Sequence, residues 1–188
     1  MPDANTPWDF RESLIAAGTL EALFTGLDAA ITAAGYLPMA GQIVDATQAA
    51  APRQRNTEAE KARIKGGGKA AAIWHDKPAK ARQQGTDARW TTKFSKAKTV
   101  ADGKPQIDIA IPSFGCKSHI SIDRRHGLIR RGKTTTAAAH DGAVLRKGLI
   151  DPNNAASDVL ADTAYSSAEN ERYLAGLACV SRIHRRKP

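Results

Sequence analysis

Apolar residues recur at helical spacing through the first 35 residues of the chain. Thr6 and Pro7 are typical of the start of a helix, and Asp9 follows near the position of a capping box. Gly18 ends this first helix, and a second apolar stripe continues to Gly35. The stripes consist of Phe10, Leu14 and Ala17, then Leu20, Leu23, Phe24, Leu27 and Ile31. We predict an acidic helical element in residues 1–37 that packs through these stripes and carries no chemistry.

A short apolar run and a long polar stretch follow. Residues 39–46 predict a buried strand that ends at Asp45. Thr57 and Glu60 have the spacing of a capping box, which predicts a helix that ends at a run of three glycines. We expect residues 48–105 to form a long basic insertion whose second part, with little periodicity, is loosely structured on its own.

From residue 106 onward, apolar and polar residues alternate at strand spacing. We expect strands near residues 107–111, 120–122 and 128–129, a hairpin turn at 125–127, a helix from His140, a strand that ends at Asp162, a helix capped by Ser166 and Glu169, and a strand at 178–183. A meander followed by helix, strand, helix and strand predicts a mixed α/β sheet, so we assign residues 38–188 to one domain.

Charge is unevenly distributed along the chain and indicates a polyanionic partner. The net charge of +9 combines −5 in residues 1–52, zero in 53–60, +9 in 61–104 and +5 in 105–188. An exposed basic face without a partner explains the charge equally well when charge is considered alone.

The sequence favours a cytoplasmic protein. No apolar run is long enough to span a bilayer, and the first residues carry acidic groups where a signal peptide needs positive charge. Cys116 and Cys179 lie far apart and lack the spacing of metal ligands, so we expect two reduced thiols.

Asp45 and Asp162 stand where predicted strands end. Neighbouring strands lie about 4.8 Å apart, so acids at two adjacent strand ends can share one cation. Mg²⁺ binds through one or two carboxylates, waters and substrate phosphates, and such ions assist phosphodiester displacement. Aspartate after a strand is also common in turns and helix caps. Because Ser166 and Glu169 provide a cap for the following helix, we expect Asp162 to be available for another role.

Several segments together carry a family resemblance. In chain order they read IVDAT, APRQRNTEAE, DARWTTK, FGCKSHISIDRRHGLIR, AAAHDG and LADTAYSSAENE, followed by VSRIHRRKP. From about Phe10 to Pro188 the chain resembles transposases of insertion-sequence family five, which belong to the DDE class with a ribonuclease-H-like core. The resemblance implies Mg²⁺- or Mn²⁺-dependent cleavage at transposon ends and strand transfer. The implied partners are double-stranded DNA, as terminal inverted repeats and target, and further copies of the chain, at the nucleoid in the cytoplasm.

The resemblance assigns the first two catalytic, metal-binding acids to Asp45 and Asp162, and a conserved-motif tyrosine to Tyr165. The third acid of the family, a glutamate, falls on a helix after Pro188, so we expect a core that is incomplete at its C-terminus. Glu169 and Glu171 stand too close to Asp162 to replace it. The alternatives are a DNA-binding remnant that does not cut and an unfolded product of a decayed gene.

The chain departs from the family pattern at two positions. Cys116 replaces an aromatic residue, and Ser166 stands where the family has an arginine. The second change either removes a phosphate contact or is neutral, since serine supplies a helix cap.

Further residues are candidates for DNA contacts. Two pairs of arginines flank the predicted hairpin and suit backbone phosphates, although such pairs are also common on exposed faces. In the insertion, tryptophans stand among lysines and could stack on bases or pack in a core. The candidates are Arg124, Arg125, Arg130, Arg131, Lys69, Lys77, Lys93 and Trp90.

Histidines His119, His126 and His140 have no compact metal-binding spacing, so we expect no metal site there. His140 and Asp141 match the His-Asp dipeptide of the family, which implies a supporting element near the active site. The start of a helix explains this dipeptide equally well.

Overall fold

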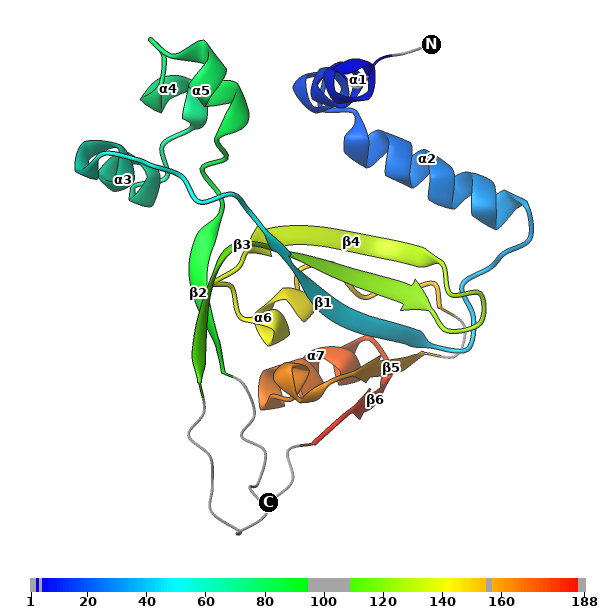
Figure 1. The fold of residues 1–188 in the computed structure, drawn as a ribbon. Coiled ribbons are helices and arrows are strands. Elements are labelled where there is room, and N and C mark those ends of the chain that lie inside the picture. Colours follow the sequence, from blue (N-terminus) through cyan, green and yellow to red (C-terminus); the bar gives the residue numbers. More distant parts are fainter. Residues whose placement is uncertain (1–2, 4, 95–108, 155–156, 186–188) are drawn as a thin grey trace, which may run out of the picture.

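The structure, a computed structural model, describes residues 3, 5–94, 109–154 and 157–185 (Figure 1). These residues form a mixed sheet with helices around it, so the predicted α/β class is confirmed. The strands are β1 (Gln42–Ala50), β2 (Arg89–Phe94), β3 (Ala110–Asp123), β4 (Ile129–Thr136), β5 (Asp158–Ala161) and β6 (Val180–Ile183). The helices are α1 (Asn5–Ala16), α2 (Leu20–Ala33), α3 (Glu58–Lys65), α4 (Ala70–Ile73), α5 (Pro78–Gln83), α6 (Asp141–Leu145), the 3₁₀ turn η1 (Thr163–Tyr165) and α7 (Ala168–Gly176).

Strand β1 lies in the middle of the sheet, whose strand order is β2-β3-β1-β5-β6. Strands β1 and β3 are antiparallel along nine residue pairs, from Gln42 beside Asp123 to Ala50 beside Gly115. Strands β2 and β4 pair with the first and second halves of β3, both antiparallel. Strands β5 and β6 continue the sheet on the other side of β1, and both run parallel to it. The sheet therefore joins an antiparallel half to a parallel half through β1.

The hydrophobic core lies between the sheet and the helices α6 and α7 (Figure 1). Strand β1 alternates between buried and exposed residues at its start, so Val44 faces the core while Ile43 and Asp45 do not. The core consists of Val44, Val144, Leu145, Leu149, Ile150, Val159, Ala161, Tyr165, Leu174 and Ile183.

Two predicted strand boundaries differ from the structure. The first strand starts at Gln42, after Ala40 and Gly41 take positive φ angles of 64° and 88°, and continues to Ala50. Asp45 is therefore in the middle of a strand, because pairing with the long β3 extends β1 beyond its apolar run. Residues 110–123 form one continuous strand, while the expected isoleucine strand near 107–111 lies partly outside the described residues. The turn at 125–127 is confirmed.

The N-terminal helices are present as predicted, but their apolar stripes are exposed. No side chain of α1 or α2 is buried, and Leu27 is 57% exposed. The cap also differs, because Asp3 rather than Thr6 accepts hydrogen bonds from the first backbone N–H groups of α1. The prediction that these helices pack through their stripes is wrong. A polar contact attaches α2 to the sheet instead, since Asp28 pairs with Arg130 at 2.8 Å.

Taken singly, none of the described helices is long and apolar enough to cross a membrane. Only α1 and α2 together, bent by 96° between them, reach that length and composition.

The described part of the basic insertion, residues 48–94, is folded, where the sequence predicts a loose segment. Trp74 follows α4, contacts Glu60 of α3 and Lys80 of α5, and is 1% exposed. The indole Nε1 of Trp74 donates to Glu60 Oε1 at 2.7 Å, and Lys80 Nζ pairs with the same oxygen at 2.8 Å. The predicted capping box of Thr57 and Glu60 is confirmed. Periodicity gives no sign of this small core, because its helices are short and one tryptophan holds them together.

Candidate active site

Asp45 lies on β1, and Asp162 directly follows β5, the parallel neighbour of β1. Ile43 of β1 stands beside Leu160 of β5. Continued by two residues, the same register would bring Asp162 beside Asp45, and the charges of both aspartates act on Tyr165. Both side chains are exposed, on the sheet face that does not carry the core. Carboxylates on neighbouring strands start from backbones about 4.8 Å apart, which is close enough to share one cation.

In each aspartate, one carboxylate oxygen accepts a hydrogen bond from a nearby backbone N–H group. Asp45 Oδ1 accepts the backbone N–H of Ala46 at 2.7 Å, and Asp162 Oδ1 accepts that of Ala164 at 2.9 Å. Asp162 thus caps the short turn η1, whereas the cap of the following helix α7 comes from another residue, as the sequence predicts. The second oxygen of each carboxylate accepts no hydrogen bond from a described residue. A local backbone hydrogen bond and cation binding are therefore compatible at both positions.

The cap of the following helix is one residue later than predicted. The hydroxyl of Ser167, rather than that of Ser166, accepts the backbone N–H of Asn170 at the start of α7. Glu169 pairs with Arg146 at 2.7 Å, and Asn170 rather than Glu169 occupies the third helical position, where a capping box has its acid.

Tyr165 lies beneath the carboxylate pair. Its side chain is 1% exposed, and its hydroxyl has no hydrogen-bond partner among the described residues. Burial raises the pKa of Tyr165, and the charges of Asp141, Asp45 and Asp162 raise it further. The hydroxyl therefore remains protonated at neutral pH and is a hydrogen-bond donor. Asp141 forms an ion pair of 2.8 Å with Lys117 of β3, so its charge is partly neutralised.

The segment that carries Asp162 is held in place by Asn170 of α7. The amide Nδ2 of this fully buried residue donates to the carbonyl oxygens of Gly142 and Tyr165, at 2.9 and 2.7 Å. A Cβ atom on Gly142 would lie 2.8 Å from the carbonyl oxygen of Ala164, so only glycine lets α6 approach η1 this closely. His140 starts α6 as expected.

His119 is buried on β3 and is not part of a histidine cluster. Its Nε2 lies 2.8 Å from Thr135 Oγ1, and its Nδ1 has no partner among the described residues. Burial lowers the pKa of His119, which favours the neutral ring. His126 stacks edge-on against Tyr36 instead.

Arg130 is one of the arginines predicted to bind phosphate, and the structure contradicts this prediction. It is 2% exposed, and its guanidinium contacts Asp123 at 3.1 Å, Asp28 at 2.8 Å and the carbonyl oxygen of Tyr36. These contacts bind α2 to the sheet and leave no group for a phosphate. Arg131 is exposed but pairs with Asp151 at 3.4 Å.

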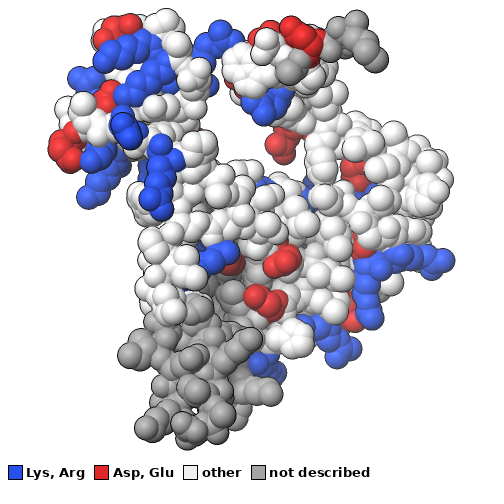
Figure 2. All heavy atoms as spheres, in the orientation of Figure 1, with Lys and Arg blue, Asp and Glu red and all other residues white. Residues whose placement is uncertain are grey.

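The other predicted cations are accessible. Arg124 and Arg125 at the β3–β4 turn are exposed, as are Lys69, Lys77 and Lys93 of the insertion, and none forms an ion pair with another described residue. Figure 2 shows basic side chains gathered over α3, α4 and α5, with a small acidic group at the centre of the same face of the molecule.

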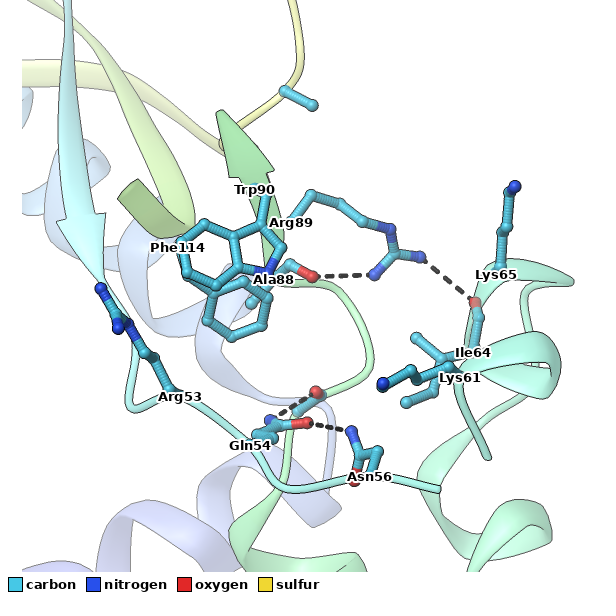
Figure 3. Close-up of a pocket in the computed structure, with 12 residues that line it drawn as sticks. Arg53, Gln54, Asn56, Lys61, Ile64, Lys65, Ala88, Arg89, Trp90 and Phe114 are labelled. Carbon is cyan, nitrogen blue, oxygen red and sulfur yellow. Dashed lines mark hydrogen bonds between the residues drawn. The ribbon is translucent and has the colours of Figure 1, made fainter. Parts of the chain in front are cut away.

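Trp90 stands at a cavity that the sequence did not reveal. This cavity of about 530 Å³ lies between α3 and the strands β2 and β3 (Figure 3). Trp90 is 52% exposed. The sequence had indicated Trp90 as a candidate for DNA contact, but not Arg53, Gln54 and Phe114, which also line the cavity. Only the tryptophan among basic residues could have suggested the cavity, because its other walls come from segments far apart in the sequence.

The carboxylate pair fits a hard divalent cation in part. Among the residues that the structure describes, no group of three or more His, Cys, Asp or Glu side chains is arranged for a metal ion. Mg²⁺ keeps several waters and binds proteins through one or two carboxylates, so Asp45 and Asp162 match the smaller donor set it accepts.

Comparison with known proteins adds no relative: no protein-family model, curated protein sequence or solved structure matches this chain.

Proposed function

We propose that this chain is a DDE-type DNA transposase with a ribonuclease-H-like core, in which Asp45 and Asp162 bind Mg²⁺ or Mn²⁺. The observation that supports the proposal is the parallel pairing of β1 with β5, whose register, continued by two residues, brings the exposed Asp45 toward the exposed Asp162 that follows β5. The motif resemblance had selected the same two residues from the sequence alone, without any knowledge of their pairing.

The arrangement of the sheet supports a ribonuclease-H-like core. Three antiparallel strands, β1, β3 and β4, are followed by a helix, a parallel strand, a helix and a second parallel strand. The basic insertion separates the first two strands of this order and adds β2 to the sheet edge. The acids stand on the central strand and directly after its parallel neighbour, where a substrate backbone can approach the exposed side chains.

The residues around the pair have distinct tasks in this proposal. When bound, a divalent cation would lower the pKa of an attacking oxygen and offset charge on a phosphate. Asp45 and Asp162 would hold it, while one carboxylate oxygen of each accepts a local backbone N–H. Lys117 reduces the negative charge of Asp141 beside the pair. Tyr165 offers a protonated hydroxyl under the site.

Double-stranded DNA is the proposed partner, in the cytoplasm and with copies of the chain on paired transposon ends. The exposed cations of the insertion and of the β3–β4 turn would contact backbone phosphates, so binding should weaken steeply with salt. The cleaved end would then join to target DNA.

The test is nicking of supercoiled plasmid DNA by the purified chain with MgCl₂ or with EDTA. We expect Mg²⁺-dependent nicking that Asp45→Asn and Asp162→Asn abolish. Asp76→Asn, a matched change at an exposed aspartate of the insertion, should leave nicking intact. Mg²⁺ should also raise the thermal midpoint of the wild type but not of Asp162→Asn, because only a site that binds the ion gains stability. Nicking that persists in Asp162→Asn contradicts the proposal.

A second candidate is a DNA-binding protein that does not cut. The absence of a third metal-binding side chain beside the pair, within the described part of the chain, favours it. Salt-sensitive DNA binding without Mg²⁺-dependent nicking would select this second function. A missing cooperative unfolding transition would contradict both.

A further inference from the structure

The cavity beside Trp90 has an aromatic wall. The rings of Trp90 and Phe114 come from β2 and β3, and their centroids lie 5.5 Å apart with planes inclined by 48° (Figure 3). The strands pair these two residues directly, so the sheet register fixes the wall. The guanidinium of Arg53 lies 5.2 Å from the centre of the Trp90 ring and supports it from the side of the loop that follows β1. Half of the indole is nevertheless exposed.

The opposite wall and the floor are braced by hydrogen bonds. Arg89 donates to the carbonyl oxygen of Ile64 at 3.3 Å, which ties β2 to the end of α3. Gln54 Nε2 donates to the carbonyl oxygen of Gly85 at 3.0 Å, and Asn56 donates to Gln54 at 3.2 Å. The cavity is therefore preformed.

Positive charge surrounds the opening. Arg53, Lys61, Lys65 and Arg89 line the cavity, and no aspartate or glutamate does. Lys65 makes no ion pair with another described residue. Lys61 pairs with Glu58 at 2.6 Å, but both side chains are largely exposed, so a phosphate can compete for the lysine at little cost. A cationic ligand is thus disfavoured, and a planar ligand that carries a phosphate is favoured.

We propose that this cavity binds one unpaired nucleotide, with its base against Trp90 and Phe114 and its phosphate at Lys61 and Lys65. Every base has an apolar face that stacks on aromatic side chains, and cations beside them bind the backbone. A cavity of about 530 Å³ is in the range of small-molecule sites and admits a nucleotide rather than a duplex. The nucleotide belongs either to DNA or to a free pool. The DNA source rests on the proposed function, whereas the site itself does not.

The test measures binding of fluorescein-labelled duplexes and of free dAMP. One duplex carries a single unpaired adenosine, a second carries an abasic residue at the same place, and a third is fully paired. We expect the unpaired adenosine to be bound about tenfold more tightly than either other duplex, since one stacked base is worth roughly that factor. Trp90→Ala should remove this preference, and Trp90→Phe should retain most of it.

Matched variants separate stacking and charge from general effects. Phe94→Ala removes an exposed aromatic ring from the same strand outside the cavity, and should change no affinity by more than about twofold. Lys65→Gln should weaken binding of dAMP, and Lys147→Gln, an equal change of charge at an exposed lysine outside the cavity, should not. Thermal unfolding confirms that each variant is folded.

Failure of this site and failure of the proposed function give different results. Equal affinity for all three duplexes, or equal weakening of all three by Trp90→Ala, overturns the site but leaves DNA binding intact. Trp90-dependent binding of dAMP without binding of any duplex supports the site for free nucleotides and contradicts the proposed function. If neither dAMP nor the unpaired adenosine is bound, the site is wrong.

Discussion

Asn170 connects α6, η1 and α7, and its removal tests how the segment around Asp162 is held. The side chain is completely buried; it donates to two carbonyl oxygens and accepts a hydrogen bond from Arg146 Nη1 at 2.6 Å. We expect Asn170→Ala to leave the carbonyls of Gly142 and Tyr165 buried without these donors. The two helices and the turn would then lose their shared connection.

The expected loss of stability follows from the two carbonyl oxygens that would lose their hydrogen-bond donors. Each buried polar group left without a partner costs about 1–3 kcal/mol, so Asn170→Ala should reduce the free energy of unfolding by about 2–6 kcal/mol. Asn170→Asp keeps the size of the side chain but has no amide donors, and should be destabilising by a similar amount at neutral pH. A single domain is typically stable by about 5–15 kcal/mol, so either change removes a large share of the total.

Equilibrium unfolding in urea measures this effect. A lower midpoint with an unchanged dependence on urea indicates a loss of stability alone. Asn153→Ala, the same substitution at an exposed asparagine, is the control and should change stability by less than about 0.5 kcal/mol. A loss below about 1 kcal/mol for Asn170→Ala, or a stable Asn170→Asp, would refute the reasoning that donors rather than volume hold these segments together.

Three further predictions test other contacts. The hydrogen bond from Lys80, followed by that from the helix cap, lowers the pKa of Glu60 from 4.5 to about 2. The stability that this carboxylate contributes is therefore complete above pH 4.5 and is lost as the pH falls toward 2, which the fluorescence of Trp74 should report in a chain without its other tryptophans. Arg130→Leu should reduce the free energy of unfolding in urea by about 3–5 kcal/mol, because it leaves a buried carboxylate without its cation, whereas Arg125→Leu should be neutral. Gly142→Ala should lower both the thermal midpoint and the stabilisation by Mg²⁺, since the added Cβ pushes α6 away from η1.

Each of these has a contrary result. Glu60→Gln should remove the pH dependence between 4.5 and 2, and a transition that persists there assigns it to other groups. Equal effects of Arg130→Leu and Arg125→Leu would mean that the buried ion pair is not formed in solution. A Gly142→Ala variant with unchanged midpoint and unchanged Mg²⁺ response would show that the close approach to η1 is unimportant.

The sequence predicted the parts of the fold that depend on local pattern. The strand before Asp162 and the capping box of Thr57 and Glu60 were both found, because alternation and cap spacing act within a few residues. The pairing of β1 with β5 follows from no local pattern, since none specifies which strands become neighbours.

The features that the sequence did not predict all depend on contacts between residues far apart in the chain. Arg130 stands in an exposed-looking basic hairpin, and only the fold brings Asp28 to it from 102 residues away. Trp74 acquires a core from three short helices, none of which has a periodic apolar face. The cavity at Trp90 likewise needs the end of α3 beside β2, which no spacing in the sequence indicates.

The central position of β1 has a consequence for folding. The segments that carry Asp45 and Asp162 are 117 positions apart in the sequence, and they meet only after β5 docks against β1. Contacts of such long separation pay a large entropic cost of loop closure, and they slow folding relative to local contacts. A chain whose antiparallel half alone has formed holds only one of the two acids in place. Under the proposed function, a divalent cation that needs both aspartates would select the fully assembled sheet, and its binding would report that β5 has docked against β1.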